Sequence, residues 1–397
     1  MSDRLKVAMV AACPFPWPRG TPIRIHRMAE AVARRGHEVH VATYHLGEAL
    51  TDAPFLLHRI RDVPSYRYTA PGPTARKLVQ LDPMLAGLLR RLHRDVGFDV
   101  VHAHHYEGLL VASRSAAGTP IVYDAHTTLA GELPDYRLGL PRWLARGIGA
   151  WLDRRLPARA DHTVAVISYI RDALVSNGAT TPERIHVVAN GVEWERFDVA
   201  HPGDRDGRTV IFTGNLSPYQ RVDLLIEAFA QLHARRPDTR LMITTDSSFA
   251  PFEARAQELG VRDAIDLRNA PFPQQPALLA GAAVTVNPRV ACDGIPQKLL
   301  NYMAAAAPIV SFEGSAGHLQ HEITGLRVPN GDTTAMARAI ERLLDDPALA
   351  RRLGAAARDL VQRAFSWDGV AERVEQIYFD VLSRAAGRPT VPRSASP

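Results

Sequence analysis

Short apolar runs alternate with amphipathic helical patterns along this chain, and the alternation pauses once before it restarts. KVAMVAA, at residues 6–12, is the first apolar run, and TVIFTGN, at residues 209–215, opens the second series. Such alternation is typical of stacked βαβ units with a parallel sheet. Residues 194–208 between the two series follow neither period. The sequence therefore predicts two doubly wound α/β domains, which bind ligands at the carboxyl ends of their strands.

The length of the chain agrees with two domains, because 397 residues exceed what one hydrophobic core usually serves. The predicted divisions are an N-terminal domain, a linker, a C-terminal domain, a final amphipathic helix and a disordered tail. Their bounds are 1–193, 194–208, 209–364, 365–385 and 386–397.

The charge and the cysteine content of the chain indicate which ligands and which compartment to expect. The formal net charge of +5 suits a phosphate-bearing ligand or an anionic membrane surface. No basic run or zinc-finger spacing supports binding to nucleic acid. Only Cys13 and Cys292 are present, so we expect a cytoplasmic protein in a reducing compartment. No apolar run reaches the roughly 20 residues of a membrane span, which leaves at most a peripheral membrane contact.

Two loops in the first half of the chain follow apolar runs and carry candidate ligand residues. Gly20 stands before a helical pattern near residues 23–35, whose amides are predicted to meet an anion, and Arg19 and Arg24 flank it. A plain Pro-rich turn explains the same letters equally well. His126 follows a buried run and is predicted to line the ligand site, although a core histidine is the alternative.

Two further stretches resemble metal sites only superficially. HAHHYE at residues 102–107 has no common zinc spacing, and DRD at residues 204–206 lies in the linker composition. We therefore predict neither a metal nor another cofactor.

A basic, Trp-containing helical pattern covers residues 140–161. Trp143 and Trp151 share it with several arginines, a composition suited to an anionic bilayer surface. A surface helix that packs its apolar stripe on its own domain is the commoner explanation.

Two loops of the second half carry groups suited to a diphosphate. FTGNLSPYQRVDLLIEAF at residues 212–229 runs from a strand through a glycine loop into a helix, and the polar loop residues are Gly214, Asn215, Gln220 and Arg221. DGIPQKLLNYMA at residues 293–304 has an acidic residue, a Gly-Ile-Pro turn and a lysine before a helix. Cationic and amide donors at helix N-termini are the usual ligands of phosphate.

These stretches, in this order and spacing, resemble retaining glycosyltransferases of family four. The resemblance extends over about residues 5–385 and includes ANGVEWERF at residues 189–197 and the closing FSWDGVAERVEQIY pattern. It implies the GT-B architecture, in which two Rossmann-like domains face each other across a cleft. It also implies that the last helix crosses back to the N-terminal domain.

The resemblance assigns roles residue by residue, with departures. The family usually has two glutamates eight positions apart, for the sugar hydroxyls and the ribose, where this chain has Asp293 and Asn301. The arginine and lysine that usually hold the diphosphate are replaced by Asn215 and Gln220. Arg221 and Lys298 are the expected replacements for that charge.

Three further assignments complete the predicted site. His126 matches the family's histidine beside the transferred sugar, the Gly294 and Ile295 amides hold that sugar, and Gly20 lines the cleft. The implied activity is metal-independent transfer, with retention, of a sugar from a nucleoside diphosphate to a glycan, lipid-linked or small-molecule acceptor. A sugar-nucleotide epimerase and a catalytically inactive binding partner are the alternatives.

Overall fold

The structure is a computed structural model of the 397-residue chain. It describes residues 4–17, 20–69, 72–116, 118–136, 140–198, 205–292 and 295–387. The chain divides into two compact units, and the first unit ends at Gly191 and resumes at Trp367. The second unit is the continuous segment Val192–Ser366. Asp293, Gly294 and Arg19, which carry sequence predictions, lie outside the described residues.

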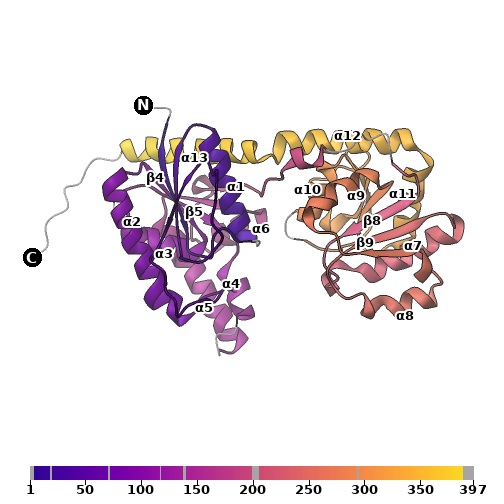
Figure 1. Ribbon diagram of the computed structural model, residues 1–397, viewed down its shortest axis with the longest axis horizontal. Coiled ribbons are helices and arrows are strands. Elements are labelled where there is room, and N and C mark those ends of the chain that lie inside the picture. The colour runs from indigo at the N-terminus through magenta and orange to yellow at the C-terminus, as the bar shows by residue number, and fades with distance from the viewer. Residues whose placement is uncertain are drawn as a thin grey trace, which may run out of the picture. The chain divides into compact units, whose positions relative to one another are not determined.

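The first unit contains a seven-stranded parallel sheet with the order β3-β2-β1-β4-β5-β6-β7 (Figure 1). Its strands are β1 (Lys6–Ala11), β2 (Glu38–Thr43), β3 (Leu56–Arg59), β4 (Val100–His104), β5 (Ile121–Ala125), β6 (His162–Ala165) and β7 (Ile185–Val187). Its α-helices are α1 (Gly20–Arg34), α2 (Asp82–Val96), α3 (His105–Ser115), α4 (Leu129–Glu132), α5 (Arg142–Arg155), α6 (Ser168–Ser176) and α13 (Trp367–Ala386). The strand order reverses between β1 and β4, as in Rossmann folds.

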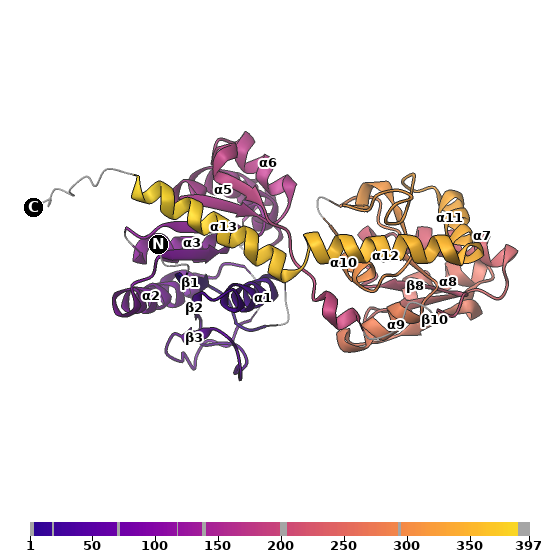
Figure 2. The same ribbon diagram turned by 90° about the horizontal axis from the view of Figure 1, so that it is seen from above.

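Both faces of this first sheet are covered, which explains why its strands are apolar at nearly every position. In β1, Val7 and Met9 belong to one core cluster, whereas Ala8 and Val10 belong to the cluster on the other face. Helix α13 contributes to the first of these clusters and packs beside α1 (Figure 2). Its Tyr378 is fully buried there.

The second unit repeats the design with a six-stranded parallel sheet in the order β10-β9-β8-β11-β12-β13. Its strands are β8 (Thr209–Thr213), β9 (Arg240–Thr244), β10 (Ile265–Arg268), β11 (Val284–Asn287), β12 (Ile309–Phe312) and β13 (Leu326–Val328). Its α-helices are α7 (Val222–Arg235), α8 (Ala250–Glu258), α9 (Gln275–Gly281), α10 (Gln297–Ala304), α11 (Thr333–Asp345) and α12 (Pro347–Ala364). The predicted pair of doubly wound α/β domains is confirmed.

The end of the predicted linker is anchored by a partly buried arginine, Arg205. Arg205 donates to the carbonyls of Leu279, in the last turn of α9, and Ala282, just after it, at 2.9 and 2.7 Å. It also donates to those of Ala305 and Ala306 after α10, at 3.1 and 2.9 Å. Carbonyls at helix C-termini lack intrahelical partners and carry partial negative charge, so a guanidinium satisfies them well. Burial lowers the pKa of Arg205 to about 10, which still leaves it charged.

None of the helices in the described part of the chain is both long and apolar enough to cross a bilayer.

Candidate active site

Lys298 lies in the first turn of α10, at the carboxyl end of the second sheet. Its Nζ donates to Oε1 of Gln220 at 2.8 Å and lies 3.8 Å from the centroid of the Phe212 ring. Gln220 closes a short 3₁₀ turn, Pro218–Gln220, and is buried. Strand β8 and helix α10 therefore bring together two residues that are 78 positions apart in sequence.

Gly214 makes this approach possible. Its φ is +133°, a conformation that other residues rarely adopt, and a Cβ built there would lie 3.1 Å from the Nζ of Lys298. The adjoining Thr213 fixes the strand to the helix, since its N–H donates to the hydroxyl of Tyr302 in α10 at 2.9 Å. The glycine thus leaves the ammonium group directly against the backbone after β8.

The ammonium group is held without a carboxylate partner among the residues that the structure describes. Burial, with a smaller contribution from the charge of Arg289, lowers the pKa of Lys298 to about 7. A partly buried cation with only an amide oxygen and a ring beside it is costly to desolvate and gains from an anionic ligand.

Arg289 is a second cation of this site, and the sequence reasoning did not single it out. It follows β11, and its guanidinium lies 4.8 Å from the centroid of the Tyr219 ring. The Tyr219 hydroxyl accepts a hydrogen bond from the side-chain amide of Asn215 at 3.0 Å. A charged residue just after a buried strand was the available signal, because loops after parallel strands form the ligand edge of such sheets.

In the first unit, the corresponding sheet edge holds a buried ion pair. Arg24 donates through Nε to Oδ2 of Asp124 at 3.0 Å, and both side chains are nearly inaccessible to solvent. Its other nitrogens donate to Asn190 Oδ1 at 3.0 Å and to the Val188 carbonyl at 2.9 Å. These three contacts indicate a structural role for Arg24. Burial would raise the pKa of Asp124, but Arg24 and the neighbouring histidines hold it well below its usual range.

His126 lies against this pair, with Nε2 at 3.8 Å from the other carboxylate oxygen of Asp124. Burial lowers the pKa of His126 well below its usual value despite the attraction of Asp124. The ring is therefore neutral at pH 7 and has an unused buried nitrogen, Nε2. His126 therefore belongs to the buried network around Asp124, and its contact with a transferred sugar stays a prediction.

Three groups of this edge have metal-ligand atoms within 4.8 Å of one another, namely His102, His104 and Asp124. Two of them already have other partners: the Arg24 guanidinium binds Asp124, and the Tyr378 hydroxyl lies 2.7 Å from Nδ1 of His102. A guanidinium at 3.0 Å from the shared carboxylate oxygen would repel a divalent cation. The residues present fit a buried ion-pair network better than a metal centre.

Gly20 begins α1 and lines a cavity of about 310 Å³ in the first unit. The polar side chains of its wall include Lys77, Glu107, His105 and Glu132. The His105 ring bonds to Glu132 at 3.0 Å, and although burial opposes it, this contact raises the pKa of His105. The cavity therefore presents both signs of charge and hydrogen-bonding groups suited to a polar ligand.

Comparison with known proteins identifies the family. Residues 18–196 match the model for Glycosyltransferase Family 4, and residues 207–346 match a model for glycosyl transferases group 1. Together the two matches cover most of the chain. The chain belongs to glycosyltransferase family four. The sequence-based recognition is thereby confirmed.

Curated relatives of this glycosyltransferase align over most of its length. A D-inositol 3-phosphate glycosyltransferase of Rhodococcus opacus is 27% identical over 94% of this chain and 90% of its own. An MMP alpha-(1->4)-mannosyltransferase of Mycolicibacterium hassiacum is 26% identical over 73% of this chain and 72% of its own.

Solved structures confirm the GT-B fold of the glycosyltransferase. A sucrose-phosphate synthase from Thermosynechococcus elongatus superposes with a TM-score of 0.71 at 18% identity, over 96% of this chain and 100% of that one. Anabaena HepE, crystallised with UDP, superposes with a TM-score of 0.70 at 18% identity, over 95% and 100% of the two chains.

The remaining predicted donor residues of the glycosyltransferase fall in different surroundings. Arg221 does not join Lys298, because its guanidinium binds the carboxylate of Asp223 at 2.8–3.2 Å. Asn301 is buried in α10, one turn after Lys298. Ile295 lies beside Gly317, where a Cβ would be 3.2 Å from its side chain.

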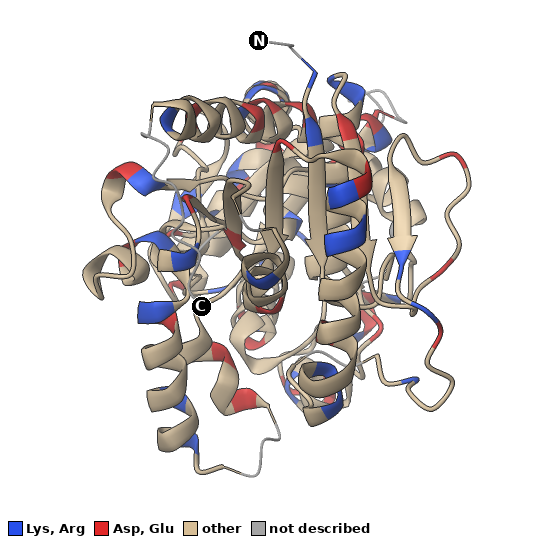
Figure 3. Cartoon of the chain, turned by 90° about the vertical axis from the view of Figure 1, so that its left-hand side faces the viewer, with Lys and Arg blue, Asp and Glu red and all other residues tan. Residues whose placement is uncertain are grey.

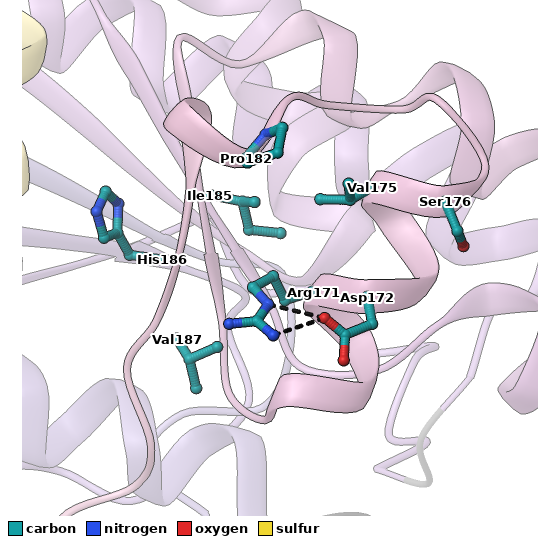
Figure 4. Close-up of a pocket in the computed structure, with 8 residues that line it drawn as sticks. All are labelled: Arg171, Asp172, Val175, Ser176, Pro182, Ile185, His186 and Val187. Atoms are coloured by element: carbon teal, nitrogen blue, oxygen red, sulfur yellow. Dashed lines mark hydrogen bonds and ion pairs between the residues drawn. The ribbon is translucent and has the colours of Figure 1, made fainter.

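Another cavity in the first unit of the glycosyltransferase, of about 550 Å³, lies between α6 and β7 (Figure 4). Its lining is partly apolar, and its charged pair, Arg171 and Asp172, is joined by hydrogen bonds of 2.9 and 2.7 Å. Because Arg171 and Asp172 neutralise each other, this cavity has a weaker charge for a ligand than the site of Lys298.

Proposed function

We propose that this glycosyltransferase moves a sugar from a nucleoside-diphosphate donor, bound by its second unit, to an acceptor hydroxyl, with retention of the anomeric configuration. The observation that carries the proposal is the partly buried Lys298 ammonium, which Gln220 and the Phe212 ring hold without a carboxylate partner in the described chain. The donor diphosphate supplies the missing negative charge.

The proposed chemistry accounts for a cation at this position. The bond between the anomeric carbon and the β-phosphate oxygen breaks, and negative charge grows on that phosphate as the sugar gains oxocarbenium character. Lys298 stabilises the leaving diphosphate in a water-poor site, where a charge acts more strongly than in water. The acceptor oxygen bonds to the anomeric carbon on the same face, and its proton passes to the departing phosphate. No protein nucleophile is required.

Metal independence is part of the same proposal. Lys298, with Arg289 or Arg221 as its second cation, would neutralise the diphosphate in place of a divalent ion. The carboxylate of Asp124 is paired with Arg24, which supports a structural role for Asp124 rather than a role as a metal ligand. Turnover that is unchanged in excess EDTA is the expected result, and turnover that stops in EDTA and returns with Mg²⁺ would contradict it.

The donor and acceptor follow as proposals from the relatives. HepE has been crystallised with UDP and with UDP-glucose, so UDP-sugars are the first donors to test. Several curated relatives are named for D-inositol 3-phosphate, which makes a hydroxylated small molecule or glycan precursor the acceptor class to test. We propose a cytoplasmic location, consistent with the free thiols of Cys13 and Cys292.

A thermal-shift panel of UDP-, GDP- and TDP-sugars tests the proposal, because a ligand that binds only the native state raises its apparent stability. At 100 times its Kd, the correct donor adds about 2.7 kcal/mol. The variant Lys298→Met should lose most of this shift. NMR of the product then reports whether the anomeric configuration is retained.

Two outcomes would replace the proposed function. Conversion of the donor sugar to its epimer without an acceptor would favour an epimerase. The absence of both binding and turnover across the panel would favour an inactive partner protein.

A further inference from the structure

Helix α5 turns a large aromatic surface to solvent. Trp143 is 74% exposed and Trp151 is 57% exposed, and Ile148 between them is 39% exposed. Leu140, just before the helix, is 44% exposed. Isolated exposed apolar residues are ordinary, but two tryptophans and an isoleucine exposed on one helix, with Leu140 just before it, call for a partner.

The opposite face of α5 shows that the helix is firmly seated. Ala145, Gly149 and Asp153 are its buried residues. A Cβ at Gly149 would lie 2.4 Å from the Leu129 carbonyl, so only glycine permits this close packing on α4. The carboxylate of Asp153 accepts hydrogen bonds from the Leu129 and Ala130 amides at 2.8 and 2.9 Å. The aromatic face is therefore the outer side of a helix whose inner side is already packed.

The charge on α5 is positive on its outer side. Asp153 is the only acidic residue of the helix, and α4 uses it fully. Arg142 pairs with Asp135 at 3.0 Å, whereas Arg146, Arg154 and Arg155 have no ion pair in the described part of the chain. The bands of basic residues along α5 are visible at the lower left of Figure 3. The Arg155 guanidinium lies 5.6 Å from the centroid of the Trp151 ring.

We propose that this face of α5 docks on an anionic membrane surface. Tryptophan rings favour the boundary between headgroups and acyl chains, where one part of the ring is apolar and another stays hydrated. Arginines beside them meet lipid phosphates and carboxylates, for which the guanidinium geometry is suited. A basic helix with Trp and Ile on its outer face has the composition of an interfacial helix.

Docking by α5 would also bring the polar cavity of the first unit close to the membrane. The α4 helix, on which α5 packs, carries Glu132, and this residue bonds to His105 in the wall of that cavity. A single short helix thus separates the docking face from the cavity wall. A polar group attached to a membrane lipid would then have to extend past only α4 to enter the cavity.

Vesicle flotation tests the proposal without donor or acceptor, so its result does not depend on the proposed transfer reaction. We expect the full-length protein to float with vesicles that contain anionic phosphatidylglycerol and to stay unbound with pure phosphatidylcholine. The double variant Trp143→Ala/Trp151→Ala should lose affinity by at least about tenfold through lost apolar burial. Arg154→Gln/Arg155→Gln should lose on the order of 30-fold, and high salt should produce a similar loss.

Matched controls come from other helices of the first unit. Tyr169→Ala removes an aromatic ring that is 54% exposed on α6, and Arg90→Gln/Arg91→Gln removes two exposed charges from α2. Both controls should bind vesicles as the wild type does, and circular dichroism should show that every variant is folded. Equal flotation of the Trp variant and the wild type would overturn the proposal. So would a dimer in analytical ultracentrifugation that the Trp variant abolishes while vesicle binding is absent.

Discussion

Each of the two sheets has a cation at the carboxyl end of its strands, Arg24 buried and Lys298 partly buried, and the two have opposite kinds of partner. Arg24 in the first unit has a fully buried carboxylate, Asp124, at 3.0 Å. Lys298 in the second unit has an amide oxygen at 2.8 Å and the face of a phenyl ring, and no carboxylate among the described residues. The fold neutralises the charge of Arg24, and we propose that a bound ligand neutralises that of Lys298.

The partners of a charged side chain indicate whether it stabilises the fold or is available to a ligand. A buried ion pair with additional hydrogen bonds is insensitive to ligands, because its charge is already balanced. A buried cation without a counter-charge shifts its pKa instead, and burial lowers that of Lys298 to about 7. The same reasoning applies to Arg205, whose four carbonyl partners identify it as an anchor rather than a ligand.

The largest predicted effect concerns the paired cation. Arg24→Met leaves Asp124 as an uncompensated buried charge, so the first unit should lose about 3–5 kcal/mol of unfolding free energy. Urea denaturation followed by circular dichroism measures this loss. Arg171→Met is the control, because it removes an arginine from an exposed pair with Asp172 and should cost at most about 1 kcal/mol. Wild-type stability of Arg24→Met would contradict the structural role.

The unpaired cation should show the reverse behaviour. Lys298→Met keeps the aliphatic stem over Phe212 but removes the charge, so turnover should fall by about 10²–10³-fold. Unfolding free energy should change by no more than about 1 kcal/mol, because the fold gains nothing from the charged form. Steady-state kinetics and urea denaturation of the same variant provide both values. A variant that unfolds easily yet turns over normally would reverse the assignment of the two cations.

Most of the fold could be predicted from the sequence, because strands buried on both faces appear as apolar runs that need no partner to be recognised. The apolar runs at residues 6–12 and 209–215 contain the strands β1, Lys6–Ala11, and β8, Thr209–Thr213. The edge strands β3 and β7 were not predicted, since they have only four and three residues and are partly exposed. A short edge strand is defined by its neighbour more than by its own composition.

The candidate site was less predictable, because the role of a charged residue depends on distant partners. Lys298 was singled out by a local motif, and its contact with Gln220, 78 positions away, appears only in the structure. In the sequence, Arg24 was only a flank of the Gly20 loop, which a Pro-rich turn explains equally well. Its partner Asp124 is 100 positions away, and no local sequence pattern connects the two residues.

The pKa of Lys298 predicts a pH dependence of donor binding. Its folded-state pKa is lowered to about 7, so the free site is cationic below pH 7 and loses its charge above it. Donor affinity should therefore weaken by about tenfold between pH 7 and pH 8.5, with uptake of a proton on binding. Calorimetry in buffers of different ionisation enthalpy measures that proton. Lys298→Arg should flatten the profile, because arginine stays charged in this range. A flat profile in the wild type would show that Lys298 does not meet the diphosphate.

The smallest effects distinguish the two arginines that could assist Lys298. Arg289 has no carboxylate partner among the described residues and lies close enough to lower the pKa of Lys298, so Arg289→Gln should weaken donor binding by about tenfold. Arg221, the residue expected from the sequence, is held by Asp223 in a partly exposed pair. Arg221→Gln should therefore change donor affinity by less than about threefold.

Donor titrations at pH 7 compare these two variants directly. Substituting Asp223→Asn as well separates the two roles, because it releases Arg221 from its carboxylate. If Arg221 meets the diphosphate only when it is free, the Asp223→Asn variant should bind the donor more tightly than the wild type. A larger loss for Arg221→Gln than for Arg289→Gln would restore the sequence-based choice. It would also show that a carboxylate partner at the surface, unlike the buried Asp124, does not withdraw an arginine from ligand binding.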